Sequence, residues 1–159
     1  MIFITVGSQK FQFNRLLETI DTLIKNKEIT EDVFAQTGYS NYKPKNYKFK
    51  DFLDRDEFES AISKCSILVT HGGTGAIVNG LKREKKVIAV PRLKKYKEHV
   101  DDHQLQIIHE FEGMNLISAV YDLKDLKDCI NTIKDKVFNK YESNTRNIIN
   151  SIDKFIAVN

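Results

Sequence analysis

The sequence has few of the residues that mark secreted, metal-bound or membrane-spanning chains. Its 159 residues include two cysteines, two prolines and no tryptophan. Cys65 and Cys129 are too few and too far apart for a zinc site or a disulfide framework, so we expect both to be small core residues at helix ends or interiors. We see no signal peptide and no apolar run as long as a membrane span. Membrane association is therefore expected to be peripheral or to depend on a partner.

Basic residues are distributed unevenly along the chain, although the net charge is only +3. One stretch holds most of the clustered bases: Lys82, Arg83, Lys85, Lys86, Arg92, Lys94, Lys95 and Lys97. A solvated face is the favoured interpretation, and attraction to anionic lipid headgroups or to a phosphate-bearing ligand is the alternative. No zinc-finger, helix-turn-helix or RNA-binding pattern accompanies these charges, so we expect no nucleic-acid partner.

The apolar pattern predicts strands that alternate with helices. The expected strands are Ile2–Val6, Asp32–Thr37, Ile67–Thr70, Val87–Val90 and Leu116–Val120, with Tyr47–Phe52 as an edge strand or loop. The expected helices are 13–24, Asp54–Lys64, Thr74–Arg83, Glu98–Glu110 and two terminal helices within about 123–157, with apolar stripes at Leu126–Val137 and Ile148–Ile156. This order predicts one α/β domain over residues 1–159, a Rossmann-like parallel sheet with helices on both faces. Ligands are then expected beyond the carboxyl ends of the strands.

A histidine and three glycines follow the predicted strand Ile67–Thr70. The segment His71-Gly72-Gly73-Thr74-Gly75 has neither P-loop spacing nor the position of a dinucleotide fingerprint, because the first strand ends in Gly7-Ser8. A glycine turn that feeds a helix exposes backbone N–H groups to an anion. We expect these N–H groups, the Thr74 hydroxyl and the His71 imidazole to donate to phosphate oxygens. The alternative is a tight turn without a ligand.

A second polar segment, residues 91–104, follows the next predicted strand and should lie on the same edge of the sheet. Its Asp102, His103 and Gln104 offer acceptors and donors suited to sugar hydroxyls. His99 and His103 stand four residues apart, as metal ligands on a helix can, but the intervening residues do not match the H-E-x-x-H pattern. A capped helix start with solvated histidines is favoured, and no metal site is expected.

These pieces together carry a family resemblance. They are Ile4–Ser8, Ala35–Ser40, Phe49–Leu53, His71–Ala76, Val90–Arg92 and Glu98–Gln104, in the same order along the chain. With them, the sequence resembles the C-terminal, donor-binding half of family 28 GT-B glycosyltransferases. It is also similar to single-domain bacterial polysaccharide transferases of the PssE/EpsF type, and to the soluble catalytic subunit of the two-subunit dolichol-pathway UDP-GlcNAc transferase.

The resemblance implies a UDP-sugar substrate and assigns roles to residues. His71, Gly72, Gly73, Thr74 and Gly75 would bind the diphosphate, and Asp102, His103 and Gln104 would face the donor sugar. The region of Phe49 and Phe52 would lie near uracil. Asn79 stands where many relatives have a glutamate for the ribose hydroxyls, which weakens that contact. No cofactor and no essential metal are implied.

The resemblance also implies half of an enzyme, because a GT-B transferase reacts its substrates between two such domains. A separate membrane-associated subunit would bring a lipid-linked saccharide acceptor to this cytoplasmic chain, in exopolysaccharide or capsule synthesis. The reaction would be inverting hexosyl transfer. No catalytic residue is assigned: His71 is favoured as a phosphate contact over a general base. One alternative is a non-catalytic nucleotide-sugar-binding subunit that activates or anchors a complete transferase. Another is an isolated nucleotide-binding module that acts in regulation.

Overall fold

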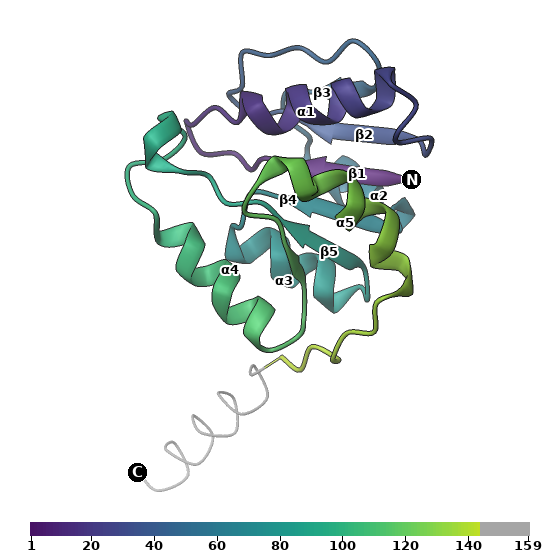
Figure 1. Cartoon of the computed structure of the whole chain (residues 1–159), viewed down its shortest axis with the longest axis vertical. Helices are drawn as coiled ribbons and strands as arrows, with labels where there is room; N and C mark the ends of the chain where they lie inside the picture. Colours follow the sequence, from purple (N-terminus) through teal and green to yellow (C-terminus); the bar gives the residue numbers. More distant parts are fainter. Residues whose placement is uncertain (144–159) are drawn as a thin grey trace, which may run out of the picture.

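The computed structural model describes residues 1–143, which form one parallel sheet with helices around it (Figure 1). The strands are β1 (Ile2–Thr5), β2 (Val33–Gln36), β3 (Lys48–Lys50), β4 (Ile67–Thr70), β5 (Lys86–Ala89) and β6 (Ser118–Ala119). Their order in the sheet is β3-β2-β1-β4-β5-β6, with every pair parallel. The chain therefore winds outward from β1 in both directions, and the direction changes between β1 and β4. At such a switch point the carboxyl ends of the strands leave a crevice.

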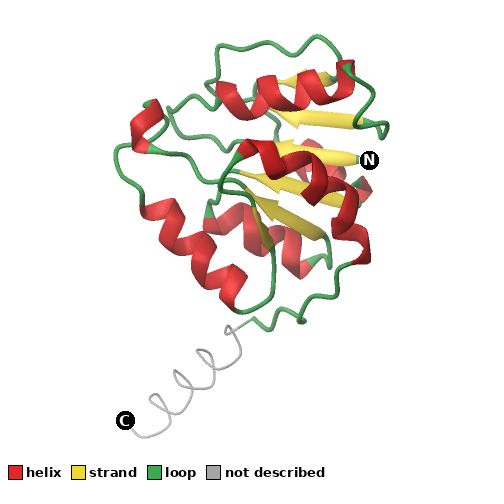
Figure 2. Cartoon of the chain, in the orientation of Figure 1, coloured by secondary structure: helices red, strands yellow, loops and turns green. Residues whose placement is uncertain are grey.

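Helices cover both faces of the sheet (Figure 2), which confirms the predicted fold class. The helices are α1 (Asn14–Lys25), α2 (Arg55–Lys64), α3 (Thr74–Lys82), α4 (His103–Gly113) and α5 (Leu126–Thr132), with 3-10 turns η1 (Lys94–Tyr96), η2 (Leu123–Asp125) and η3 (Ile133–Asp135). One apolar layer packs α1 and α5 on the sheet, and the other packs α2, α3 and α4 on the opposite face. Successive residues of β1 alternate between the layers: Ile2 and Ile4 face the first, and Phe3 faces the second.

The helix predicted over Glu98–Glu110 is wrong at its start, because α4 begins at His103. Polar side chains hold the preceding residues in a loop. The carboxylate of Glu98 accepts hydrogen bonds from Arg15 and from the backbone N–H of Leu93, and Lys97 adopts a left-handed conformation with φ 57°. Val100, inside the predicted range, is 65% exposed.

The helix predicted to carry the stripe Leu126–Val137 ends early. After α5 and η3 the backbone becomes extended at Lys136, and Val137 is exposed. The segment then runs beside the end of α4, where Asn139 N–H donates to Asn115 O at 2.9 Å. Hydrogen bonds to the end of another helix thus replace the next helical turn. The second terminal stripe, Ile148–Ile156, lies outside the described residues.

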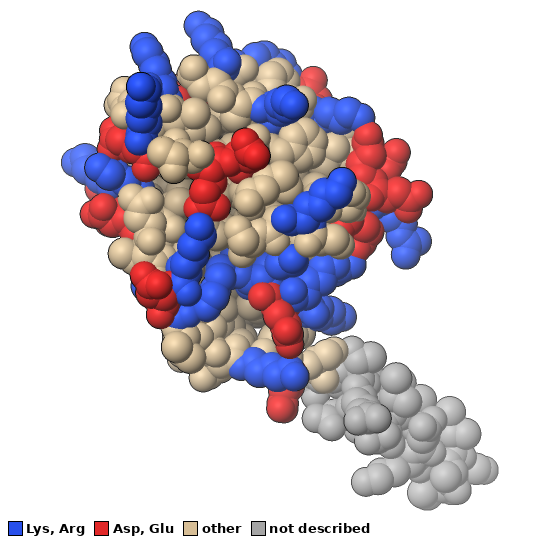
Figure 3. Space-filling model, turned by 90° about the vertical axis from the view of Figure 1, so that its right-hand side faces the viewer, with Lys and Arg blue, Asp and Glu red and all other residues tan. Residues whose placement is uncertain are grey.

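The clustered bases do not form one face. Lys82, Lys85 and Lys86 lie where α3 ends and β5 begins, at the amino-terminal edge of the sheet, whereas Lys94–Lys97 follow β5 at the opposite edge. Figure 3 views the amino-terminal edge, where basic side chains gather beside the end of the described chain. Arg92, between the two groups, is fully buried. Within residues 1–143 no helix has the length and apolar character needed to cross a bilayer.

Candidate functional site

A cleft of about 580 Å³ opens at the carboxyl edge of the sheet, at the switch point between β1 and β4. It is walled by the loop after β1, the turn after β4, and the first turns of α2 and α3. The lining residues include Thr5, Gly7, Ser8, Gln9, Gln36, Leu53, Asp54, Arg55, Phe58, Glu59, His71, Gly73, Gly75, Ala76 and Asn79. Its position is the one expected for a ligand site in a parallel α/β sheet.

Three residues of the glycine turn line this cleft, His71, Gly73 and Gly75, whereas Gly72 and Thr74 are not among its lining residues. Gly72 has φ +84°, a conformation that favours glycine, and it turns the chain out of β4. Gly73 is then the N-cap of α3, and no side chain caps the helix among the described residues. The first N–H groups of α3 therefore remain available to an external acceptor. Gly75 faces open space, since a Cβ built on it meets no atom within 4 Å.

The imidazole of His71 is held between two glycines. A Cβ on Gly73 would come within 2.5 Å of His71 Nε2, and a Cβ on Gly7 would come within 2.6 Å of Cε1. His71 is 8% exposed, and its Nδ1 lies 3.4 Å from both the carbonyl oxygen of Thr5 and the hydroxyl oxygen of Thr70. A side chain at either glycine would therefore displace the ring from this position.

His71 is neutral at pH 7 in the free protein. Burial of the ring, together with the positive charge of Arg92, lowers the pKa of His71 from 6.5 to about 4. The Thr5 carbonyl can only accept, so the single proton is assigned to Nδ1 and the lone pair to Nε2. The expected donation from His71 to phosphate through Nε2 therefore requires a proton on that nitrogen when the ligand binds.

The loop after β1 is a wall of the cleft that sequence reasoning missed. Gly7, Ser8 and Gln9 line the cleft, and Gly7 has φ +77°. The signal was present, because Gly7-Ser8 follows a buried strand just as the glycine turn does. A single glycine there did not distinguish a ligand loop from an ordinary turn.

Asn79 lines the cleft as expected, and α2 brings a carboxylate to its side. Arg83 donates from Nη1 to Asn79 Oδ1 and from Nη2 to the carboxylate of Glu59, which also lines the cleft. A guanidinium has only donors, so the oxygen of the Asn79 amide must face Arg83 and its NH₂ group is left for other partners. Asn79 thus offers donors, and Glu59 offers the acceptor.

Phe49 and Phe52 do not line the cleft. Phe49 packs against the layer formed with α1, because alternate residues of β3 face opposite sides of the sheet. Phe52 is half-exposed and packs edge-on against Tyr39 at a centroid distance of 5.0 Å. Leu53 and Phe58 supply the apolar part of the cleft wall instead.

Asp102, His103 and Gln104 lie at the same edge of the sheet but outside the cleft lining. Asp102 accepts from the N–H of Lys94 at 2.9 Å, and His103 Nδ1 lies 3.2 Å from Gln106 Oε1. Gln104 is buried behind the glycine turn, and its Oε1 accepts from the N–H of Arg92. Of the three, Gln104 approaches the turn most directly, since a Cβ on Gly72 would come within 3.6 Å of its Cβ.

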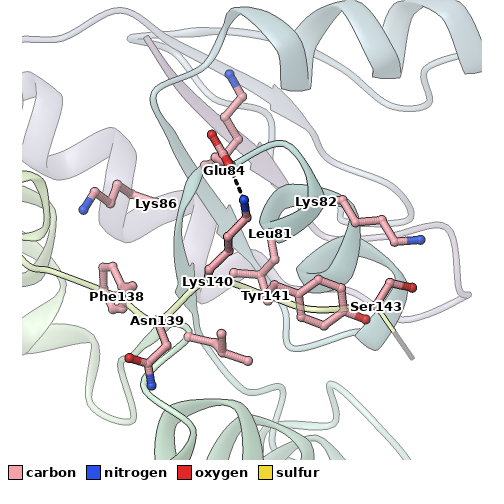
Figure 4. A pocket seen from close by; sticks show the side chains of 11 residues that line it. Leu81, Lys82, Glu84, Lys86, Phe138, Asn139, Lys140, Tyr141 and Ser143 are labelled. Carbon is pink, nitrogen blue, oxygen red and sulfur yellow. Dashed lines mark ion pairs between the residues drawn. The ribbon is translucent and has the colours of Figure 1, made fainter. Parts of the chain in front are cut away.

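A second pocket, of about 380 Å³, lies at the opposite edge of the sheet (Figure 4). Its lysines are engaged or point apart. Lys85 donates to Ser63 O and Lys86 to Lys136 O, while Lys140 pairs with Glu84 at 3.9 Å. The amines do not converge on a common point, so the cleft is the better candidate site. In residues 1–143 no three His, Cys, Asp or Glu side chains come together as metal ligands.

The chain is similar in sequence to two fungal proteins named UDP-N-acetylglucosamine transferase subunit ALG13. It is 29% identical to the Debaryomyces hansenii protein over 109 residues, covering 64% of this chain and 49% of that protein. It is 24% identical to the Candida albicans protein over 143 residues, covering 87% and 47%. The chain spans about half the length of these curated relatives.

Solved structures share the fold, and the family itself is shown by sequence. The glycosyltransferase of kitacinnamycin superposes with TM-score 0.62 at 14% identity, covering 85% of this chain and 35% of that one. Acinetobacter baumannii MurG superposes with TM-score 0.57 at 16% identity, covering 82% and 40%. The fold therefore corresponds to one half of a GT-B enzyme. The sequence profile of the glycosyltransferase family 28 C-terminal domain matches residues 1–157, and the chain belongs to that family.

Proposed function

We propose that this chain is the donor-binding subunit of a two-component glycosyltransferase that uses a UDP-sugar. The observation that carries the proposal is the uncapped start of α3, which faces a cleft at the switch point of the sheet. Backbone N–H groups and the helix dipole favour an anion there. Membership of family 28 and the names of the fungal relatives point to UDP-sugars as the source of that anion.

The proposed ligand pose follows the chemistry of the cleft walls. The diphosphate would lie over His71 and the N–H groups of Gly73, Thr74 and Gly75. Uracil would rest on the apolar wall of Leu53 and Phe58, which replaces the expected role of Phe49 and Phe52. The ribose would lie near Asn79, where an amide donor and a carboxylate acceptor suit a hydroxyl pair.

The proposed reaction is inverting transfer of a hexose to an acceptor hydroxyl, without an essential metal. As the bond to the anomeric carbon breaks, negative charge grows on the departing diphosphate. N–H donors that are already oriented at the helix start stabilise that charge without reorganisation. The acceptor hydroxyl must lose its proton to a general base. We propose that the partner subunit supplies this base, because His71 points its lone pair at the diphosphate position.

The acceptor side of the reaction is also assigned to a partner. A GT-B enzyme has two domains, and this fold corresponds to one of them. We propose that a membrane-associated subunit binds a lipid-linked saccharide and covers the cleft. Exopolysaccharide or capsule synthesis is the proposed setting, with this subunit at the cytoplasmic face of the membrane.

Calorimetric titration with UDP tests the binding step. Gly75→Asp places a carboxylate in the open space above the helix start without a clash, and it should weaken UDP binding at least about tenfold by charge repulsion. Gly113→Asp is the matched control, because Gly113 also faces open space but lies at the end of α4. Absence of UDP binding by the unaltered chain, or equal affinity of the Gly75→Asp variant, would refute the proposed site.

Transfer assays separate the enzyme from the alternative, a non-catalytic subunit that activates a complete transferase. The chain is mixed with the candidate partner, a UDP-sugar and a lipid-linked acceptor. The proposal expects transfer only with both chains present, and loss of transfer in Gly75→Asp but not in Gly113→Asp. Transfer by the partner alone, or transfer that survives Gly75→Asp, supports the alternative.

A further inference from the structure

Arg92 is a fully buried arginine directly after β5, and its surroundings are unusual for a charged group. Its side chain is 0% exposed. Nη2 donates to Val6 O at 2.6 Å and to Phe11 O at 3.0 Å, while Nε and Nη1 have no hydrogen-bond partner among residues 1–143. Burial lowers the pKa of Arg92 to about 10, so it remains charged at pH 7. No carboxylate in the described part of the chain pairs with it.

The nearby Arg15, which is only partly buried, shows how another arginine of this region is paired. It forms a two-point contact with Glu98, at 2.7 Å through Nε and 3.0 Å through Nη2, and also donates to Pro91 O. The charge of Arg15 is neutralised by that carboxylate. Arg92 has weaker compensation: Glu98 attracts it only from beyond ion-pair distance, and the Phe13 ring centroid lies 5.6 Å from its guanidinium carbon. Burial of a charge without a directly paired counter-ion is costly. The two hydrogen bonds that Arg92 donates to backbone carbonyl oxygens must therefore help to hold the chain in this arrangement.

Those two carbonyls stand at the two ends of one loop. Val6 precedes and Phe11 ends the segment 7–11, whose Gly7, Ser8 and Gln9 line the cleft. A second hydrogen bond to this segment, from Gln36 Nε2 to Gly7 O, is long at 3.4 Å. The His99 ring also packs on Phe11, at a centroid distance of 4.7 Å. One guanidinium thus joins both ends of a cleft wall to the segment that follows β5.

We propose that Arg92 is a positioning residue of the site, which holds the 7–11 loop in the shape that the nucleotide contacts. The loop also limits His71, because Gly7 lies against its ring. If this loop were mobile, neither this wall of the cleft nor the His71 imidazole would be held in place. The planar fork of arginine suits this task, since two N–H groups of one nitrogen point in different directions at fixed angles. The ligand part of this inference rests on the proposed function, whereas the loop part does not.

Hydrogen exchange and UDP titration of two variants test the inference. Arg92→Met removes charge and donors, and Arg92→Lys keeps the charge but lacks the fork. We expect amide exchange in residues 7–11 to rise about tenfold or more in both. We expect the Kd for UDP to rise about tenfold in both. Arg15→Met is the matched control and should leave exchange in the 7–11 loop unaltered.

Each other outcome has a definite meaning. Unchanged exchange in the loop of both Arg92 variants overturns the inference, as does an equal rise in Arg15→Met. Wild-type behaviour of Arg92→Lys beside a defective Arg92→Met also overturns it, because the planar fork of arginine would then not be what holds the loop. If neither Arg92 variant folds, Arg92 is a residue of the general core and the inference is wrong. If the unaltered chain binds no UDP, the proposed function fails, and the exchange data still decide whether Arg92 holds the loop.

Discussion

At the residue scale, His71 is the residue for which the structure departs most from the expectation based on sequence. A histidine beside three glycines predicts a donor to phosphate. Packing between Gly7 and Gly73 instead buries the ring, and the Thr5 carbonyl occupies its Nδ1–H. The neutral imidazole presents a lone pair to the cleft. Binding of an anion at this position should therefore be coupled to the uptake of a proton.

The first prediction concerns stability against pH. The pKa of His71 is about 4 in the folded chain and 6.5 in the unfolded chain, so the unfolded state binds more protons between these values. The contribution of His71 to stability is complete above pH 6.5 and is lost as pH falls towards 4, by about 3 kcal/mol at most. In denaturant unfolding, the free energy of unfolding of His71→Gln should therefore change less with pH between 4 and 6.5 than that of the unaltered chain. An unaltered slope, or a flatter slope in the control His109→Gln, would contradict this prediction.

The second prediction concerns proton uptake on binding. A diphosphate beside His71 should raise the pKa of its imidazole, because an opposite charge favours the protonated form. UDP binding at pH 6 should therefore take up protons, and the affinity should increase as the pH is lowered from 7 to 6. Calorimetry in two buffers of different ionisation enthalpy measures the uptake. His71→Gln gives the contribution of UDP itself, and equal uptake by this variant would refute the link.

The third prediction compares two glycines of one turn. A methyl on Gly73 would press on His71 Nε2 at 2.5 Å, so Gly73→Ala should lose about 1–3 kcal/mol of stability. A methyl on Gly75 meets nothing, and Gly75→Ala should keep or slightly gain stability as alanine favours the helix. Thermal unfolding compares the two variants. Equal stability of both would show that His71 can move freely out of its place.

At the scale of elements, α2 and α3 act together on one side of the cleft. α2 begins with a capping box in which Asp54 and Glu57 bond to each other's backbone N–H. This fixed start places Glu59 one turn later, beside Arg83 and Asn79 of the neighbouring segment. The family resemblance predicts a weakened ribose contact at Asn79, because many relatives have a glutamate there. The two helices together restore a carboxylate to that part of the cleft.

The fourth prediction follows from this pairing. If Glu59 accepts from a ribose hydroxyl, UDP should bind about tenfold more tightly than 2′-deoxy-UDP or 3′-deoxy-UDP. Glu59→Gln should reduce that preference to about threefold or less. Glu57→Gln is the control, because glutamine preserves the cap and Glu57 does not line the cleft. An undiminished preference in Glu59→Gln would exclude the carboxylate from ribose recognition.

At the scale of the whole molecule, two apolar layers enclose the sheet within residues 1–143. α1 and α5 complete one layer, and α2, α3 and α4 complete the other. The lining of the cleft also comes from this part of the chain. The fold and the proposed nucleotide site should therefore not depend on the residues that follow.

The fifth prediction is that a chain ending at Ser143 keeps both properties. It should unfold in one cooperative thermal transition and bind UDP within about threefold of the 159-residue chain, a difference below 1 kcal/mol. Its loss of activity with a partner, if seen, would then locate partner contacts in the removed segment. A chain that lacks a cooperative transition would show that the second apolar layer needs those residues.

Local patterns predicted much of this architecture from the residues alone. Apolar strands such as Ile67–Thr70 are short and continuous, which is typical of strands buried on both faces. The alternation with helices then leaves a parallel sheet as the consistent arrangement. The predicted start of α4 failed because the backbone around Glu98 is determined by Arg15, which is 83 residues away in sequence. Periodicity within a segment contains no information on such a distant partner.

The sequence alone determined the α/β class, the family and the position of the glycine turn, because each depends on short local patterns and on their order along the chain. Which residues line the cleft depended on the tertiary structure. Gly7 and Glu59 came to it from other elements, while Phe49 and Phe52 turned away, because the strand order and the side-chain alternation decide which residues meet. The tertiary structure also determines the protonation state of His71 and the role of Arg92. Both arise from burial and from the groups that packing brings within reach, and neither can be read from neighbours in sequence.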